Sequence, residues 1–535
     1  MYLDFNSYSY PSRRNVIFGK NGMTATGSTF AADAGMEMLK KGGNCIDAIV
    51  AMAMCLPVVE PTANGIGGDA FAIAHIDGKV YGLNASGWSS KNISAKVLKD
   101  KGMEEIPPYG LEAVNLPGAP AAWAALMEKF GKFTLEEVAE PAIKYAEEGF
   151  PVPVGVASGW KNTYNNLSKN HNDELHAGWF KTFGTEPPKP GDMRSYKHMG
   201  ATLREIAKTK AKSFYQGDLM EKMVSFMEKH GGYLDKSDFT EYEAQWVEPV
   251  STNYKGYDVL ELPPNGDGIT ALMALNILSS FELDSVRESA RNYHLQMEAI
   301  KLAFADAHKY VADPKHMNVS VEELISKEYG KKRAKEICEN SAKLFTYGDP
   351  KASGTVYLCA ADKYGNSVSY IQSNYMGFGS GIVVDGTDIS LHNRGHNFTM
   401  EEGHANELGP RKRSFHTIIP GFLMKDGKAI GPFGVMGGFM QPQGHLQMMV
   451  NTIDFHMNPQ DSLDATRFQW MKGMEISLES SVSNGIAQKL SEMGHKINLL
   501  HNYTSMGRGQ IIWRLENGVL VGGTEPRTDG MVAAW

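Results

Sequence analysis

Residues 354–373 read GTVYLCAADKYGNSVSYIQS. Two arms rich in β-branched and aromatic residues flank a short turn with a glycine, which predicts a β-hairpin. A three-residue loop with the glycine in a left-handed conformation pairs Asp362 with Asn366. Counting outward from that pair places Thr355 opposite Ser373. Two hydroxyl groups therefore lie side by side on one face of the hairpin, provided that the register does not slip by one residue.

The dipeptide Gly354-Thr355 opens the first arm of this hairpin. A threonine hydroxyl is a weak nucleophile at neutral pH and needs an adjacent base. A threonine at a chain terminus carries its own base, because a free α-amine titrates near about pH 8. Inside an uncut chain the same nitrogen is an amide without basicity. Taken alone, the dipeptide indicates no more than the start of a strand after a loop.

The composition is that of an ordinary globular protein, with 535 residues, 42% hydrophobic and 21% charged. This length allows a large core and favours more than one domain. The net charge of -8 argues against nucleic acid as a partner. Residues 1–8 lack the basic and apolar segments of a signal peptide. No stretch approaches the roughly 18 apolar residues that span a membrane. We therefore expect a cytoplasmic protein without a membrane partner.

No motif in the chain calls for a metal or an organic cofactor. The four cysteines lack metal or CxxC spacing, and we expect them to be buried free thiols. The glycine-rich stretch at residues 60–69, EPTANGIGGD, lacks the Lys-Ser/Thr of a phosphate-binding loop. It fits either tight turns that hold a strand against the core or the wall of a site.

A glycine pair, Gly437-Gly438, separates a predicted strand from a predicted helix. Glycines at such a turn leave backbone N–H groups aimed outward at the positive end of the helix. Donors of this kind stabilise the oxyanion of a tetrahedral intermediate by about 3 kcal/mol each. A plain tight connection is the alternative. The other expected elements are helices over 30–40 and 44–59, strands over 70–75, 79–84 and 429–436, and a helix over 442–453.

Together these motifs resemble the γ-glutamyltransferase family of N-terminal-nucleophile (Ntn) hydrolases, and its acylase-like branch in particular. The resemblance covers about residues 20–535 and rests on landmarks that occur in family order, including Leu116-Pro117-Gly118, Gly377-Phe378-Gly379, Arg467-Phe468 and Glu525-Pro526-Arg527. It implies an α+β fold, the four-layer αββα sandwich. It also implies self-cleavage between Gly354 and Thr355 into a large subunit, 1–354, and a small subunit, 355–535, which remain one intertwined unit.

The same resemblance implies roles for the residues above. Thr355 would be the nucleophile, and Ser373 would orient it in place of the threonine that the family has there. Gly437 and Gly438 would bind the oxyanion. No metal or cofactor takes part.

Two departures from the family concern the substrate. Ser86 stands where the family's γ-glutamyl enzymes hold the substrate α-carboxylate with an arginine, and Asn397 stands where they have an acidic partner for the α-amine. Nearby polar residues would then recognise another acyl group. The candidate substrate-binding residues are Ser86, Arg394, Asn397, His416 and Tyr375. For Arg394 and its neighbours His392 and His396, a surface or inter-subunit charge is the alternative.

These observations favour a self-processing amidohydrolase or acyltransferase that attacks the amide of a small acylated substrate. A genuine γ-glutamyltransferase or glutathione hydrolase is the first alternative. The second belongs to another class: an uncleaved, non-catalytic binding or structural homologue. The expected partners are a small-molecule amide and the two fragments of the chain itself, and a homodimer remains open.

Overall fold

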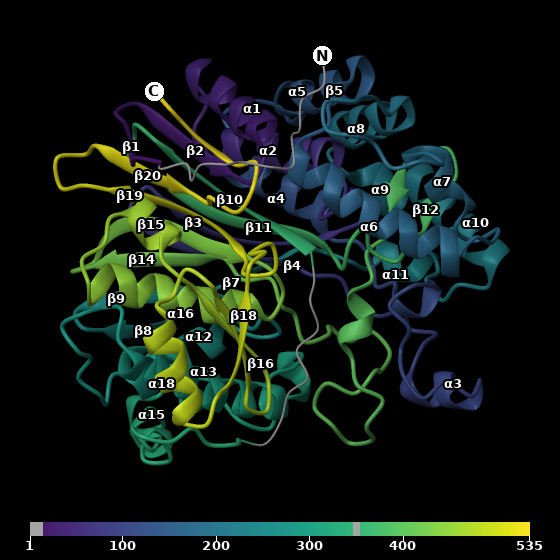
Figure 1. Ribbon diagram of the computed structural model, residues 1–535. Coiled ribbons are helices and arrows are strands. Elements are labelled where there is room, and N and C mark those ends of the chain that lie inside the picture. Colours follow the sequence, from purple (N-terminus) through teal and green to yellow (C-terminus); the bar gives the residue numbers. More distant parts are fainter. Residues whose placement is uncertain (1–13, 346–353) are drawn as a thin grey trace.

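Two seven-stranded antiparallel sheets form the centre of the computed structural model, which describes residues 14–345 and 354–535 (Figure 1). The first sheet has the order β21 (Met531–Ala534), β2 (Gly22–Thr26), β10 (Gly354–Asp362), β11 (Ser367–Tyr375), β3 (Asp69–Ile76), β4 (Lys79–Ala85), β7 (Gln245–Val247). The second has the order β1 (Ile17–Gly19), β20 (Leu520–Thr524), β19 (Arg508–Arg514), β15 (Lys428–Met436), β14 (Gly421–Lys425), β9 (Tyr257–Glu261), β8 (Val250–Tyr254).

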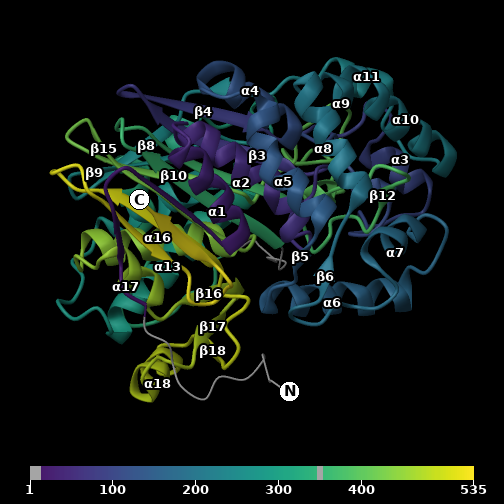
Figure 2. The same cartoon turned by 90° about the horizontal axis from the view of Figure 1, so that it is seen from above.

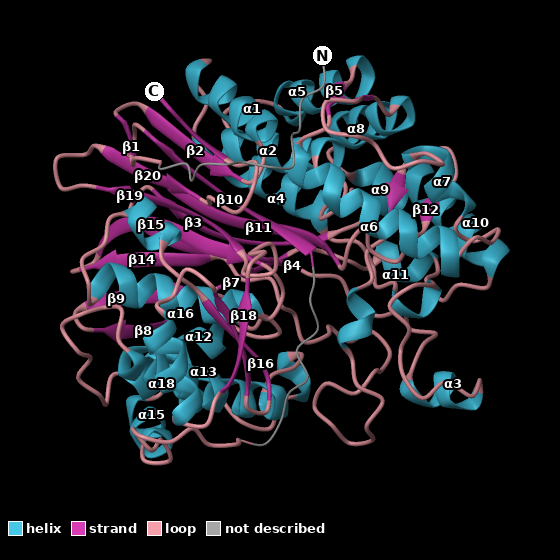
Figure 3. Cartoon of the chain, viewed as in Figure 1, coloured by secondary structure: helices cyan, strands magenta, loops and turns pink. Residues whose placement is uncertain are grey.

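The two sheets pack face to face, and helices cover both outer faces (Figure 3). Between the sheets lies an apolar layer to which both contribute, including Phe71, Tyr357, Ile371, Leu260, Phe422 and Ile512. The first sheet is covered by α1 (Thr29–Lys40), α2 (Cys45–Val59), α4 (Ala119–Phe130) and α5 (Leu135–Glu148). The second is covered by α12 (Gly268–Leu278), α13 (Ala290–Tyr310) and α16 (Met440–Ile453). This is the predicted αββα sandwich.

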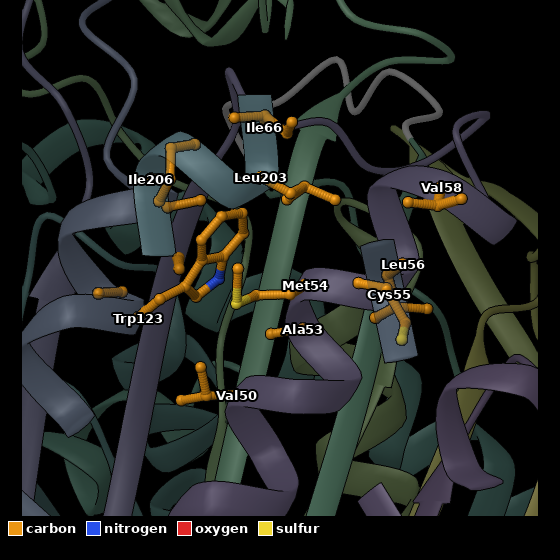
Figure 4. Packing of buried hydrophobic residues seen from close by; sticks show 14 of the residues in the cluster. Val50, Ala53, Met54, Cys55, Leu56, Val58, Ile66, Trp123, Leu203 and Ile206 are labelled. Carbon is orange, nitrogen blue, oxygen red and sulfur yellow. The ribbon is translucent and has the colours of Figure 1, made fainter. Parts of the chain in front are cut away.

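Helix α2 lies directly on the first sheet, and every residue in it is buried. Asn44 caps it by accepting from the backbone N–H groups of Ile46 and Asp47. A helix that is apolar all round is buried all round, which explains why the sequence shows no polar face here. Figure 4 shows Val50 and Met54 of this helix in one cluster with Trp123 of α4. The helix ends at Val59, and the next residue, Glu60, lines a small cavity together with Thr355 at the start of β10.

The hairpin of β10 and β11 has the predicted register, from Val356 opposite Gln372 to Ala361 opposite Ser367. Its turn contains Gly365 with φ of +95°, the left-handed conformation that a glycine adopts without strain. The register shifts by a bulge between Gly354 and Val356, at the end that carries Thr355. Bulges re-aim side chains, so this one sets the direction of the threonine.

A group of helices stands beside the sandwich at one end of the sheets (Figure 2). It contains α6 (Val154–Asn170), α7 (Ala177–Phe183), α8 (Lys197–Thr209), α9 (Lys212–Gln216), α10 (Asp218–His230) and α11 (Lys236–Thr240). The shorter elements elsewhere are α3 (Ala95–Asp100), α14 (Val321–Leu324), α15 (Lys327–Ala334), α17 (Pro459–Asp464), α18 (Asn484–Glu492), and the small sheets β5 (Phe150–Pro151) with β6 (Met193–Arg194), β12 (Val383–Val384) with β13 (Ile389–Ser390), and β16 (Phe468–Lys472), β17 (Glu475–Glu479) and β18 (Lys496–Leu500).

The cysteines are largely placed as the sequence predicts. Three cysteines are buried free thiols as predicted, but Cys338 is half-buried, because it lies in a short turn after α15 rather than in a core element. Within the described ranges, 14–345 and 354–535, none of the helices combines the length and the apolar character that crossing a bilayer requires. Residues 1–8, on which the signal-peptide argument rests, lie outside those ranges.

Candidate active site

Thr355 lies at the start of the central strand β10, where its side chain is fully buried. Its Oγ1 is 3.1 Å from Oγ of Ser373, as the hairpin count predicts. Oγ of Ser373 also accepts the backbone N–H of Tyr375 at 2.7 Å. An oxygen that accepts there retains its own hydrogen, so Ser373 is able to donate to Thr355.

Gly437 and Gly438 lie in the turn between β15 and α16, in the sheet opposite Thr355. Their φ angles are +130° and +57°, conformations that favour glycine. Their carbonyls accept the N–H groups of Met440 and Gln441 and so begin the helix. Met436, directly before the pair, lines the same small cavity as Thr355. The turn therefore presents the N-terminal end of a helix beside the threonine.

A buried charge cluster adjoins Ser373, and sequence reasoning missed its centre, Asp69. The two residues are directly opposite each other on β3 and β11. Arg394 donates to the Asp69 carboxylate from Nε at 2.9 Å and from Nη2 at 3.2 Å, and His416 donates from Nε2 at 2.7 Å. Nη1 of Arg394 donates to Oγ1 of Thr417 at 2.9 Å. The only sequence signal was one acidic residue at the end of the glycine-rich stretch.

The charges of this cluster are fixed by burial and by one another. Burial alone would raise the pKa of Asp69, but Arg394, His416 and His392 together outweigh it and hold that pKa well below its usual range. Burial, reinforced by Arg394, lowers the pKa of His416 to about 4. At neutral pH the cluster is thus an Arg394–Asp69 ion pair with a neutral His416.

The alternative of a surface or inter-subunit charge is wrong for Arg394 and His392, because both side chains are buried within the chain. An unpaired buried guanidinium would be costly, and Asp69 removes that cost. The predicted role of Arg394 and His416 in substrate binding stays a prediction. Their donors to Asp69 are already engaged, and both side chains build the wall beside Ser373.

The other predicted substrate residues lie near this wall. Ser86 is buried and donates from Oγ to Oδ1 of Asn84 at 2.7 Å. Asn397 is half-buried and donates from Nδ2 to the carbonyl of Phe415 at 3.1 Å. Tyr375 is buried under the Arg394 guanidinium, whose carbon is 4.5 Å from the ring centre. Neither Ser86 nor Asn397 carries a charge, so the wall has no replacement for the family's arginine and acid at these positions.

One group among the described residues has the spacing of metal ligands: His294, Glu298 and His495. Nζ of Lys301 is 2.5 Å from Oε1 of Glu298, and both side chains are buried. A buried ammonium at this distance already neutralises the carboxylate and repels a second cation. The arrangement is that of an ion pair within α13.

The chain is similar to known proteins along almost its whole length. Residues 31–535 match the sequence profile of a family described as Gamma-glutamyltranspeptidase. The Glutathione hydrolase-like YwrD proenzyme of Bacillus subtilis (strain 168) is 36% identical over 524 residues, covering 96% of this chain and 98% of the relative. The Acylase ACY 1 proenzyme of Pseudomonas sp. (strain SE83) is 31% identical over 530 residues, covering 96% and 94%.

A solved structure resembles the whole chain. The crystal structure of cephalosporin acylase from Bacillus halodurans has 51% sequence identity and a TM-score of 0.97, and the match covers 100% of this chain and 99% of that one. These relatives are named as hydrolases and acylases, and two of them as proenzymes. The chain belongs to the Gamma-glutamyltranspeptidase family, and it is an enzyme of the hydrolase and acyltransferase kind.

Proposed function

We propose that Thr355, freed by cleavage after Gly354, is the nucleophile of this amidohydrolase. The observation that carries the proposal is the contact of 3.1 Å between the hydroxyl groups of Thr355 and Ser373 at the start of β10. The proenzyme names of the relatives support cleavage. The segment before the bond, residues 346–353, lies outside the described residues.

After cleavage the reaction needs only groups of this chain. The α-amine of Thr355 takes the proton of Oγ1, and Oγ1 attacks the amide carbon of the substrate. The N–H groups of the Gly437-Gly438 turn stabilise the oxyanion. The same proton then passes to the leaving amine, and an acyl ester on Thr355 remains. Water, or another amine, attacks this ester and restores the threonine.

Cleavage itself is the first test. The purified protein is expected to give two masses, those of 1–354 and 355–535. Thr355→Ala removes the hydroxyl and should abolish both cleavage and hydrolysis, whereas Thr355→Ser keeps it and should be cut more slowly with some activity left. Intact-mass spectrometry measures cleavage, and an amide-hydrolysis assay measures activity. An active protein of one full-length mass would contradict the proposal.

For the substrate, we propose an acyl group without the glutamyl α-amine, such as glutaryl. Ser86 and Asn397 are uncharged, and the Arg394 charge is neutralised by Asp69. A glutamyl α-carboxylate and α-ammonium would then lose water without gaining a charged partner from these three residues. The name of the Bacillus halodurans relative, cephalosporin acylase, supports an acylated amide as the substrate but does not specify its acyl group.

The test compares kcat/KM for a γ-glutamyl anilide and its glutaryl counterpart. We expect the glutaryl anilide to be used equally well or better. Asn397→Asp should shift the ratio of the two kcat/KM values toward the γ-glutamyl anilide, because the new carboxylate pairs with the α-amine of the substrate. Asn502→Asp adds the same charge at an exposed position and should leave the ratio unchanged. A preference of the parent enzyme for γ-glutamyl of about a hundredfold, roughly 2.7 kcal/mol, would favour a genuine γ-glutamyltransferase instead.

A further inference from the structure

A small cavity lies directly against Thr355, on the side of β2. Its volume is about 10 Å³, and its lining includes Thr355, Glu60, Arg508 and Met436. A volume of this size holds about one water molecule, provided that polar partners are present. The lining brings together the start of β10, the end of α2 and the start of β19, next to the Gly437-Gly438 turn.

Glu60 supplies an unusual polar group to this cavity. Its side chain is buried, and Oε1 is 3.5 Å from Nη1 of Arg508. Oε2 has no hydrogen-bond partner among the described residues, and neither has Nε of Arg508. A Cβ atom at Gly27 would lie 3.6 Å from this Oε2 and 4.0 Å from Cγ1 of Val356, so the oxygen and the second residue of β10 border the same space beside Gly27.

A buried carboxylate oxygen without a partner is costly, and native proteins satisfy such groups with protein or water. Burial raises the pKa of Glu60 to about 7; the charge of Arg508 opposes this rise and that of Asp529 adds to it. A carboxyl group that titrates near neutral pH both accepts and returns a proton readily.

The uncut chain lacks the base that the mature enzyme has, because the nitrogen of Thr355 is still an amide. We propose that Glu60, acting through one water in this cavity, transfers the proton during self-cleavage at Thr355. The inference rests on the proposed self-processing function. Glu60 acts through the water and is therefore a positioning and proton-transfer residue rather than a group that attacks.

The step balances with the groups named. The water takes the Oγ1 proton of Thr355 and passes one to the Glu60 carboxylate, while Oγ1 bonds to the carbonyl carbon of Gly354. The bond from that carbon to the nitrogen of Thr355 breaks, and Glu60 returns the proton through the water to this nitrogen. An ester and a free amine result. A second water hydrolyses the ester, giving the carboxylate of Gly354 and the restored hydroxyl.

The experiment follows cleavage of purified precursor in a Thr355→Ser background, which is cut slowly enough to be timed. The rate should rise with pH through about 7 and then level off, because the ionised Glu60 is the active form. Adding Glu60→Gln should slow cleavage at pH 8 by about a hundredfold or more and remove this inflection. Glu148→Gln, the same change at an exposed position, should alter neither the rate nor the profile.

Chemical rescue of a Glu60→Ala precursor distinguishes proton transfer by Glu60 from a purely structural role. Glu60→Ala leaves space beside the cavity, and added formate should restore cleavage while formamide should not.

If Glu60→Gln fails to fold, Glu60→Asp decides: slower cleavage with the inflection kept supports the proposal, and an unchanged rate overturns it. A folded Glu60→Gln precursor with the parent's rate and pH profile overturns it too. If the parent chain is never cut at any pH, the proposed function falls as well, and the two failures are thereby distinguished.

Discussion

At the scale of single residues, the hydroxyl of Ser373 is held in place by its own strand. It accepts the Tyr375 N–H at 2.7 Å, which leaves its own hydrogen available for donation to Oγ1 of Thr355 at 3.1 Å. A hydrogen bond that orients a nucleophile acts mainly in the transition state and so affects kcat more than KM.

Ser373→Ala should therefore lower kcat about tenfold, the loss of one hydrogen bond of about 1.4 kcal/mol, with little change in KM. The measurement is steady-state kinetics on protein that is folded and cut. Ser369→Ala is the control: it removes a buried hydroxyl from the same strand, one that contacts the Tyr357 hydroxyl at 2.8 Å, and should cost stability without this effect on kcat. An unchanged kcat for Ser373→Ala would mean that Ser373 does not orient the nucleophile.

The Thr355–Ser373 contact was predictable because it lies within one hairpin, where counting from the turn fixes every cross-strand pair. The Asp69 cluster was not. Asp69 and His416 are 347 positions apart in the sequence, and only the folded sheets bring them together. A side chain's partner at that distance leaves no local pattern, so the sequence left a surface position open for Arg394, whereas the structure buries it against Asp69.

At the scale of elements, the turn between β15 and α16 requires glycine at its first position. Gly437 has φ of +130°, and a Cβ atom there would lie 3.1 Å from Cα of Gly507. The neighbouring atom belongs to the backbone of Gly507 and cannot move aside as a flexible side chain could. A side chain at Gly437 would therefore force the peptide groups that precede α16 to rotate.

Gly437→Ala should accordingly lower kcat by about a hundredfold, as the loss of an oxyanion donor does, together with a loss of stability. Gly427→Ala is a matched control: its φ is +73°, nothing lies within 4 Å of its Cβ position, and it occupies the turn between β14 and β15. The control should lose stability by about 1 kcal/mol through backbone strain alone and keep its kcat. If the two variants lose kcat equally, the Gly437 turn does not stabilise the oxyanion.

Elements with strong local signals were predictable to within a few residues. The helix expected over 44–59 is α2, because an apolar run with a capping asparagine needs no distant partner to be recognised. The order of strands in each sheet was out of reach of such patterns. The family resemblance implied only the layers of the sandwich, because β2, β10 and β21 pair across hundreds of residues and leave no local signal.

At the scale of the whole molecule, the proposed fragments are interleaved in both sheets. In the first sheet, β10 and β11 of the small fragment lie between β2 and β3 of the large one. In the second, β20, β19, β15 and β14 of the small fragment lie between β1 and β9 of the large one. Separation would expose the apolar layer between the sheets and break backbone pairing at several strand edges, so the cut should leave the molecule intact.

Cleavage should nevertheless change how the protein unfolds. Once Gly354 and Thr355 are no longer bonded, complete unfolding releases two chains, and mass action makes the midpoint rise with protein concentration. The uncut Thr355→Ala chain unfolds as a single molecule, and its midpoint should not depend on concentration. Urea unfolding of both proteins over a hundredfold range of concentration measures this difference, and size-exclusion chromatography should show the cut fragments eluting together. A midpoint that does not depend on concentration for fully cut protein would mean that one fragment keeps its fold alone. That result would contradict the interleaved arrangement, in which each sheet contains strands of both fragments.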